Sequence, residues 1–210
     1  NDLEGEGEGL GNLGIVYDQM GKPDEAIPLY LQALEIARKR GDQRSEGSLL
    51  GDLGYAYSLL GNEETALKYH QQPLVFARQT GDRRGESNAL TNIGNLYRVW
   101  DWPAEAVSYH AQSLAISRSL NEPASIAQDL GNLGLDYVRL ENFSSAEACY
   151  IERINLAVQI NDLAGAARGE WNLGEVYARQ GRLAEAVEYM QRCVDWEWSV
   201  AHPDAEGDMI

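Results

Sequence analysis

The chain has few of the residues that build most catalytic and metal sites, and it has little positive charge. It contains two cysteines, three histidines, and 17 lysines and arginines against 33 acidic residues, which gives a formal net charge of −16. Such an acidic balance disfavours nucleic acid, whose phosphates need a basic face, and disfavours an anionic membrane surface. The sequence also has no apolar run long enough to span a membrane. We therefore expect neither nucleic acid nor a membrane as a partner.

The cysteines and histidines occupy positions that suit packing rather than chemistry. Cys149 and Cys193 have no cysteine or histidine at metal-ligand spacing, which favours buried free thiols and a reducing, cytoplasmic location. His70 and His110 share a repeat position with tyrosine and methionine, which indicates a packing role. No nucleophile–base pair, phosphate-binding glycine loop or metal constellation is evident. The sequence thus favours a protein that is not an enzyme, with no cofactor and no metal.

What the chain does have is a period of 40 residues, repeated five times. The repeats cover 1–40, 41–80, 81–120, 121–160 and 161–200, followed by a tail at 201–210. Three positions of the repeat never change: Gly14, Gly54, Gly94, Gly134 and Gly174; Tyr17, Tyr57, Tyr97, Tyr137 and Tyr177; Ala26, Ala66, Ala106, Ala146 and Ala186. A period of this length is typical of a solenoid, in which each repeat packs on its neighbours.

Hydrophobic spacing within the second repeat predicts two helices. Apolar residues recur three and four positions apart over 43–60 and again over 64–80. Gly61 and Asn62 break the pattern between them, and Asp82 after the second stretch suits the cap of the next helix. Each repeat is therefore predicted to be a helix, a tight turn, a second antiparallel helix and a loop.

The constant glycine and alanine positions predict close contact between helices. A glycine inside a helix costs about 1 kcal/mol relative to alanine, so a recurring one implies an approach that a Cβ would block. The constant tyrosine supplies a large ring to fill the space between paired helices. All three positions are interpreted as packing.

These positions resemble the tetratricopeptide repeat. The family pattern L-G-x-x-Y, with alanine nine residues further on, appears as Leu13-Gly14-Ile15-Val16-Tyr17 and Ala26, and it recurs through the chain. The period is longer than the family's usual 34 residues and is similar to the 40-residue form of kinesin light chain, Pins-type adaptors and bacterial STAND-type signalling proteins. The resemblance implies an all-α, right-handed superhelix of helix pairs, whose first helices line a concave groove that binds a protein or peptide.

One polar position of the first helices falls in this implied groove. It directly precedes the conserved Leu-Gly pair and consists of Asn12, Asp52, Asn92, Asn132 and Asn172. Asparagine is a mediocre helix former, and its amide offers two donors and an acceptor. By resemblance to the Pins-type adaptors, this ladder would bind the backbone of an extended peptide. The alternative is that it bonds between neighbouring repeats and sets their packing; the sequence leaves both open.

Neighbouring groove positions are predicted to supply selectivity. We hypothesise that acidic groups of a ligand face Arg139, Arg168 and Arg179, where charge-assisted bonds are strong. The alternative is that these arginines are ordinary solvated charges. The other candidates for contact with the ligand are Asn88, Asn95, Arg98, Gln128, Trp171 and Glu175.

Two further tryptophans suggest an interface. Trp102 replaces polar residues of the other repeats, and Trp198 replaces Arg38, Arg78 and Arg118. Together with the lack of polar end caps, they favour a fragment of a longer protein or a homodimer through the terminal repeats. The leading interpretation is a protein-interaction or sensor module, and the loose resemblance of the tail with His202 to the STAND class implies the sensor part of a bacterial signalling ATPase. The alternative is a self-assembly module.

Overall fold

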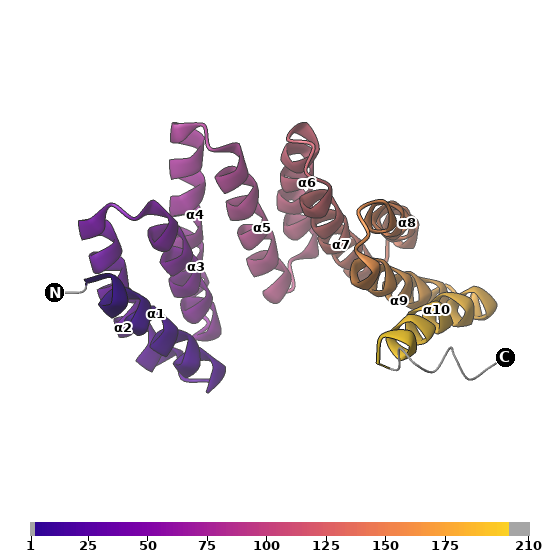
Figure 1. The fold of residues 1–210 in the computed structure, drawn as a ribbon, viewed down its shortest axis with the longest axis horizontal. Coiled ribbons are helices and arrows are strands. Elements are labelled where there is room, and N and C mark those ends of the chain that lie inside the picture. The colour runs from indigo at the N-terminus through magenta and orange to yellow at the C-terminus, as the bar shows by residue number, and fades with distance from the viewer. Residues whose placement is uncertain (1–2, 202–210) are drawn as a thin grey trace. The chain divides into compact units, whose positions relative to one another are not determined.

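The computed structural model describes residues 3–201, and within that range the regular structure is helical throughout (Figure 1). The tail predicted at 201–210, with His202, lies outside the described residues apart from the backbone of Ala201. The helices are α1 (Leu3–Gln19), α2 (Pro23–Arg40), α3 (Gln43–Leu59), α4 (Glu63–Thr80), α5 (Arg83–Val99), α6 (Pro103–Ser119), α7 (Pro123–Arg139), α8 (Phe143–Gln159), α9 (Leu163–Arg179) and α10 (Leu183–Ala201).

The helices fall into two compact units, Asn1–Trp100 with α1 to α5 and Asp101–Ile210 with α6 to α10. In each unit every helix packs mainly on the helix before it and the helix after it, and α1 also touches α3, as α7 touches α9. This nearest-neighbour packing is that of a solenoid. The predicted all-α fold of five helix pairs in chain order is confirmed, whereas the single domain over 1–200 remains a prediction.

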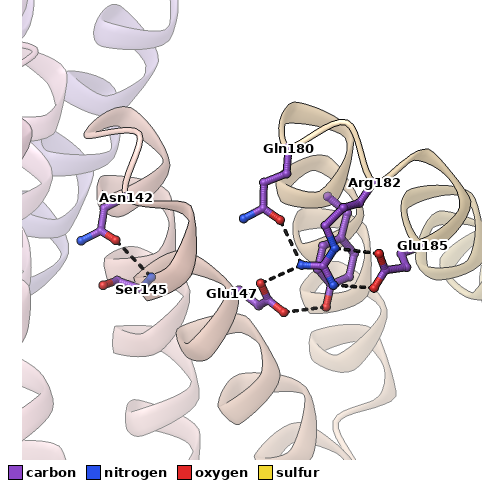
Figure 2. Close-up of polar contacts among 7 residues, drawn as sticks. Asn142, Ser145, Glu147, Gln180, Arg182 and Glu185 are labelled. Atoms are coloured by element: carbon purple, nitrogen blue, oxygen red, sulfur yellow. Dashed lines mark hydrogen bonds and ion pairs between the residues drawn. The ribbon is translucent and has the colours of Figure 1, made fainter.

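Short polar side chains fix where the helices begin. Asp42, Asp82 and Asp162 each accept a hydrogen bond from the backbone N–H three residues on. Asn142 does the same for Ser145, with 3.2 Å between Oδ1 and the backbone nitrogen (Figure 2). Such a cap satisfies one of the free N–H groups at a helix start. The predicted helices 43–60 and 64–80 appear as Gln43–Leu59 and Glu63–Thr80.

The turns between helices need a left-handed residue. Gly61 has a φ of 71° and Gly181 one of 76°, as glycine readily allows. The same turn of the fourth repeat uses Glu141, with a φ of 56°. A side chain in this conformation costs about 1 kcal/mol or more, so the turn of this repeat is strained, as is that of the third repeat, where Asp101 has a φ of 61°.

The constant glycines of the first helices sit against a large side chain of the second helices. A Cβ placed on Gly14 would lie 2.5 Å from Cε1 of Tyr30, and one on Gly134 would lie 2.6 Å from Tyr150. On Gly54 the neighbour is His70, again at 2.5 Å. The predicted close approach is therefore confirmed, and so is the packing role of His70. Each unit builds its core on these contacts.

Between α6 and α7 the second unit has buried polar pairs beside the apolar cluster of Leu114, Leu130 and Leu133. The hydroxyls of Ser113 and Ser117 donate to the two carboxylate oxygens of buried Asp129, at 3.0 and 2.7 Å. Nearby, Nδ1 of His110 and Oδ2 of Asp136 lie 2.5 Å apart, and both side chains are fully buried. Buried polar groups of this kind are tolerated because they are hydrogen-bonded.

The two cysteines differ in their surroundings. Both are free thiols, and Cys193 is buried as predicted, but Cys149 is only partly buried. Burial, with the nearby Glu152, raises the pKa of the Cys149 thiol to about 11, so it is protonated and unreactive at neutral pH. Across the described residues, every helix is too short or too polar to cross a membrane.

Candidate functional site

The asparagine position of the repeat lies in the middle of the first helices, α1, α3 and α5 in one unit and α7 and α9 in the other. Asn12 and Asn92 are exposed, whereas Asp52, Asn132 and Asn172 are partly buried. All five are thus accessible to some degree from outside, in keeping with a contact surface. Asn132 also makes an interaction within the chain, so packing and binding are not exclusive roles here.

The first unit has a small hollow between α1, α2 and α3. It has a volume of about 220 Å³, and Asn12 and Asp52 both line it, with Glu8 beside them. Ala33 of α2 closes its floor. The predicted ladder residues of two successive repeats therefore meet at one concave place.

A larger hollow, of about 1000 Å³, opens between α3, α4 and α5. Asn88 and Asn92 line it from α5, and Gly47 and Gly51 line it from α3. A Cβ on Gly47 would meet nothing within 4 Å, and one on Gly51 would meet only the amide of Asn92 at 4.0 Å. Each of these glycines costs about 1 kcal/mol in a helix without any gain in packing. They leave open space in front of the helix.

Carboxylates near the smaller hollow have perturbed acidity. Burial and the neighbouring charge of Asp18 raise the pKa of Asp52 to about 6. Burial also raises the pKa of Asp18, against a hydrogen bond of 2.8 Å that the Tyr30 hydroxyl donates to it. Asp52 is the only carboxylate in the asparagine position of the described repeats. Ionised Asp52 therefore makes this hollow acidic at neutral pH.

The histidine beside the larger hollow is electrically neutral. His70 lines the hollow from α4 and is more than nine-tenths buried. Its burial lowers the pKa of the imidazole to about 4. The side chain therefore presents an uncharged polar surface at physiological pH, and it does not add to the positive charge that Arg44 brings to the same hollow.

The remaining predicted contact residues are spread over both units. In α5, Arg98 donates a hydrogen bond to the amide oxygen of Asn95. Arg139 of α7 forms an exposed ion pair with Asp101 at 2.9 Å, so its charge is already partnered. Trp171 of α9 has 41% of its surface exposed. The other candidates are all solvent-exposed: Gln128, Arg168, Glu175 and Arg179.

Sequence reasoning missed Arg153 of α8. Its repeat position is otherwise filled by small residues, Ala33, Pro73, Ser113 and Cys193. The guanidinium lies over Gly131 of α7, where a Cβ would come within 2.0 Å of Nη1, and its Nε is buried without a hydrogen-bond partner. Burial, reinforced by the charge of Arg168, lowers the pKa of Arg153. The broken small-residue position was the signal in the sequence that could have revealed it.

Arg182, in the same unit, has a structural role and is surrounded by partners. Its Nε donates to Glu185 at 2.6 Å and its Nη1 to Glu147 at 3.0 Å, while the group lies over the ring of Tyr177 at 4.0 Å (Figure 2). The Tyr177 hydroxyl also donates to Glu147 at 3.1 Å. This network ties α8, α9 and the start of α10 together. Arg182 is thus fully partnered, in contrast to Arg153.

The two tryptophans that the sequence predicts at an interface are both exposed. Trp102 has 46% of its surface exposed and Trp198 has 61%. Over the residues that the structure describes, histidine, cysteine and carboxylate side chains form no group of three that could hold a metal ion.

Helix pairs stacked in chain order, with accessible polar side chains along the first helix of each pair, define a helical-repeat protein. Two sequence profiles, both described as tetratricopeptide repeat, match residues 5–74 and 132–197. The chain belongs to the tetratricopeptide repeat family. No curated protein matches the sequence.

Several solved structures share the fold. BtubC (BKLC) from P. vanneervenii has a TM-score of 0.77 at 19% identity, over 92% of this chain and 80% of its own. A Rap protein in complex with Competence and Sporulation Factor has a TM-score of 0.72 at 19% identity, over 90% of this chain and 53% of its own. The STAND signal transduction ATPase from Pyrococcus horikoshii has a tetratricopeptide repeat sensor. Its TM-score is 0.74 at 18% identity, over 93% of this chain and 31% of its own.

The chain thus spans about half of the Rap protein and about a third of the ATPase. At these identities the likeness concerns the fold. It does not extend to ligands or to contact residues.

Proposed function

We propose that the protein is a non-enzymatic interaction module, which binds an extended peptide or a protein segment against the first helices of its repeats. The observation that carries this proposal is the hollow of about 1000 Å³ over Gly47 and Gly51, with Asn88 and Asn92 at its wall. Glycines that face open space allow a ligand backbone to approach closely, and amide side chains can then bond its peptide groups. An extended backbone needs both donors and acceptors, and asparagine supplies both.

The comparisons support this proposal by analogy of fold. The Rap protein that resembles this chain was solved in complex with Competence and Sporulation Factor, and the ATPase that resembles it has a tetratricopeptide repeat sensor. We extend the proposal accordingly to a sensor module of a bacterial signalling protein in the cytoplasm. Arg139, Arg168 and Arg179 would then select ligands with acidic groups, as the sequence suggests.

The test is a selection of peptides from a random display library on the immobilised chain, followed by affinity measurement with fluorescently labelled peptides. Asn92→Ala should weaken binding about fivefold, because one or two hydrogen bonds worth about 1 kcal/mol in total are lost. Asn155→Ala is the matched control, since Asn155 is an exposed asparagine on a second helix, α8. Equal affinity of the two variants would refute the role of the ladder.

A second variant separates loss of binding from loss of folding. Gly47→Leu puts a side chain into the open hollow and should raise helix stability by about 1 kcal/mol, because a Cβ there meets nothing within 4 Å. Binding of the selected peptides should nevertheless be abolished. A stable Gly47→Leu protein that still binds them at full affinity would show that the hollow is not the site.

The alternative function is self-assembly, which the 61% exposure of the Trp198 side chain favours. Large exposed aromatic rings are typical anchors of interfaces. Assembly predicts a mass that rises with concentration in light scattering and that falls back to a monomer in Trp198→Arg, the residue type of Arg38, Arg78 and Arg118 at this position. A constant monomer mass across a hundredfold range of concentration would leave the groove as the functional surface.

A further inference from the structure

Arg153 occupies a place that the repeat otherwise reserves for small side chains. Its counterparts Ala33, Ser113 and Cys193 are buried, and in the first unit Ala33 forms the floor of the hollow between α1, α2 and α3. In the second unit the corresponding place between α7, α8 and α9 is entered by a guanidinium. Gly131 makes room for it, since a Cβ there would lie 2.0 Å from Nη1 of Arg153, whereas a Cβ on Gly169 would be blocked by Cγ1 of Ile154 at 2.7 Å and would only touch Cδ of Arg153 at 3.8 Å.

This arginine has no acidic partner among the residues that the structure describes. Its Nε is buried and makes no hydrogen bond. The charge that acts most strongly on it is another cation, Arg168 of α9, and the carboxylate of Asp162 has a smaller effect. Asp162 is in addition already used, because it caps α9 by accepting from the backbone of Gly165 at 2.8 Å.

Other arginines of the same unit are neutralised. Arg182 lies between Glu147 and Glu185 (Figure 2), and Arg118 pairs with Glu152 at 2.6 Å. The chain has 33 acidic residues against 17 basic ones, so a carboxylate partner would be easy to supply. An uncompensated, partly buried guanidinium is costly, and a second one beside it adds repulsion. This arrangement calls for an anion from outside the chain.

We propose that Arg153 and Arg168 form an oxyanion-binding site on the face where α7, α8 and α9 meet, for a carboxylate or a phosphate group. A guanidinium presents planar, paired donors that match such groups. Because Gly131 has no side chain, Nη1 of Arg153 can lie against the backbone of α7. The site rests in part on the proposed function, which assigns Arg168 to acidic groups of the ligand, but a free anion would also bind here without a peptide.

The experiment follows the arginine Nε–Hε signals and backbone amides by NMR during titration with inorganic phosphate, N-acetylglycine and N-acetylglycinamide. Sodium chloride at equal ionic strength gives the baseline. We expect saturable shifts of the Arg153 Nε–Hε signal and of the Gly131 and Gly169 amides. Saturation with phosphate alone identifies a phosphate-bearing ligand, saturation with N-acetylglycine but not its amide identifies a carboxylate, and saturation with both supports a general oxyanion site.

Variants assign the response to the two arginines. Arg153→Met and Arg168→Gln should each weaken binding at least about tenfold, because a charge-assisted contact is lost. Arg118→Gln removes the same charge from an exposed ion pair and should leave binding unchanged. Arg168 is exposed, so its variant tests the site even if Arg153→Met were to fold poorly. Shifts no larger than those of sodium chloride, or equal binding by Arg168→Gln and Arg118→Gln, would overturn the proposal.

Discussion

Asp52→Asn should stabilise the protein, and the size of the gain follows from the acidity of Asp52. Burial and the charge of Asp18 raise the pKa of Asp52 from 3.8 to about 6. Because the pKa of Asp52 is higher in the folded protein than in the unfolded chain, its contribution to the stability of the fold is fully present below pH 3.8. That contribution is lost as the pH rises through about 6. Each pH unit of difference corresponds to 1.36 kcal/mol, so keeping Asp52 ionised in the folded protein costs up to about 3 kcal/mol.

Asparagine has the same shape as aspartate and carries no charge, and it is the residue that the other four repeats have here. At about pH 7.5 we therefore expect Asp52→Asn to raise the free energy of unfolding by about 2 kcal/mol, with about 3 kcal/mol as the upper limit. At about pH 5 the gain should shrink by about 1 kcal/mol. There the folded wild-type protein already holds the proton, while the unfolded chain still releases it.

The assay is urea unfolding of wild type and variant over this pH range. Their difference cancels the titrating groups that do not interact with Asp52, such as His70, whereas any change at Asp18 is part of the measured difference. The control is Glu8→Gln, which removes one charge from a carboxylate that lines the same hollow but is exposed. A gain from Asp52→Asn that does not change with pH, or that Glu8→Gln matches, would show that the buried carboxylate carries no penalty.

Three further predictions concern stability. Glu141→Gly should raise the melting temperature, with about 0.5 to 1 kcal/mol of gain, because the φ of 56° suits glycine; calorimetry showing a loss would refute the strain. Asp129→Ala should cost about 2 kcal/mol in urea unfolding, because Ser113 and Ser117 lose their acceptor. Asp129→Leu with Ser113→Ala and Ser117→Ala, which copies Leu49, Ala33 and Ala37 between the first two repeats, should recover most of it, and an equal loss in both would contradict this. The pKa of His70 is about 4 in the folded protein against an ordinary value of 6.5, so the free energy of unfolding should fall by up to about 3 kcal/mol as the pH drops from 6.5 to 4. His70→Met should flatten this dependence on pH, and an unchanged dependence would count against the buried neutral imidazole.

The parts of the fold that the sequence predicts are those decided within one repeat or between neighbours. Asp82 caps its helix where the sequence places it, and Gly14 meets a large ring because its column excludes a side chain. Local turn chemistry and hydrophobic spacing suffice for such features, and repetition makes them visible five times. The accessible asparagine column was found in the same way, from its recurrence.

The features that could not be predicted are those in which one residue differs from its counterparts in the other repeats. Whether a lone Asp129 is buried or solvated follows from the two serines that happen to face it from the preceding helix. The larger hollow arises from Gly47 and Gly51 facing the amides of α5, a coincidence of three helices that no single helix pattern contains. Arg153 required knowledge of which side chains are absent around it. Comparison of equivalent positions among the repeats does not reveal these contacts, because each one depends on side chains from several helices.

Asp52 and Arg153 suggest how the two units differ in the ligands that they prefer. Both are charged side chains in positions where the other repeats are uncharged, and both are held partly buried at a cost. Asp52 and Glu8 bring two carboxylates to a hollow whose lining arginine, Arg40, already pairs with Glu4. An anionic ligand group is therefore disfavoured there, whereas Arg153 lies beside Arg168 and attracts one. Each preference follows from contacts within one unit. Asp52→Asn should then relax the discrimination against acidic peptides in the first unit only, while Arg153→Met should reduce their affinity in the second.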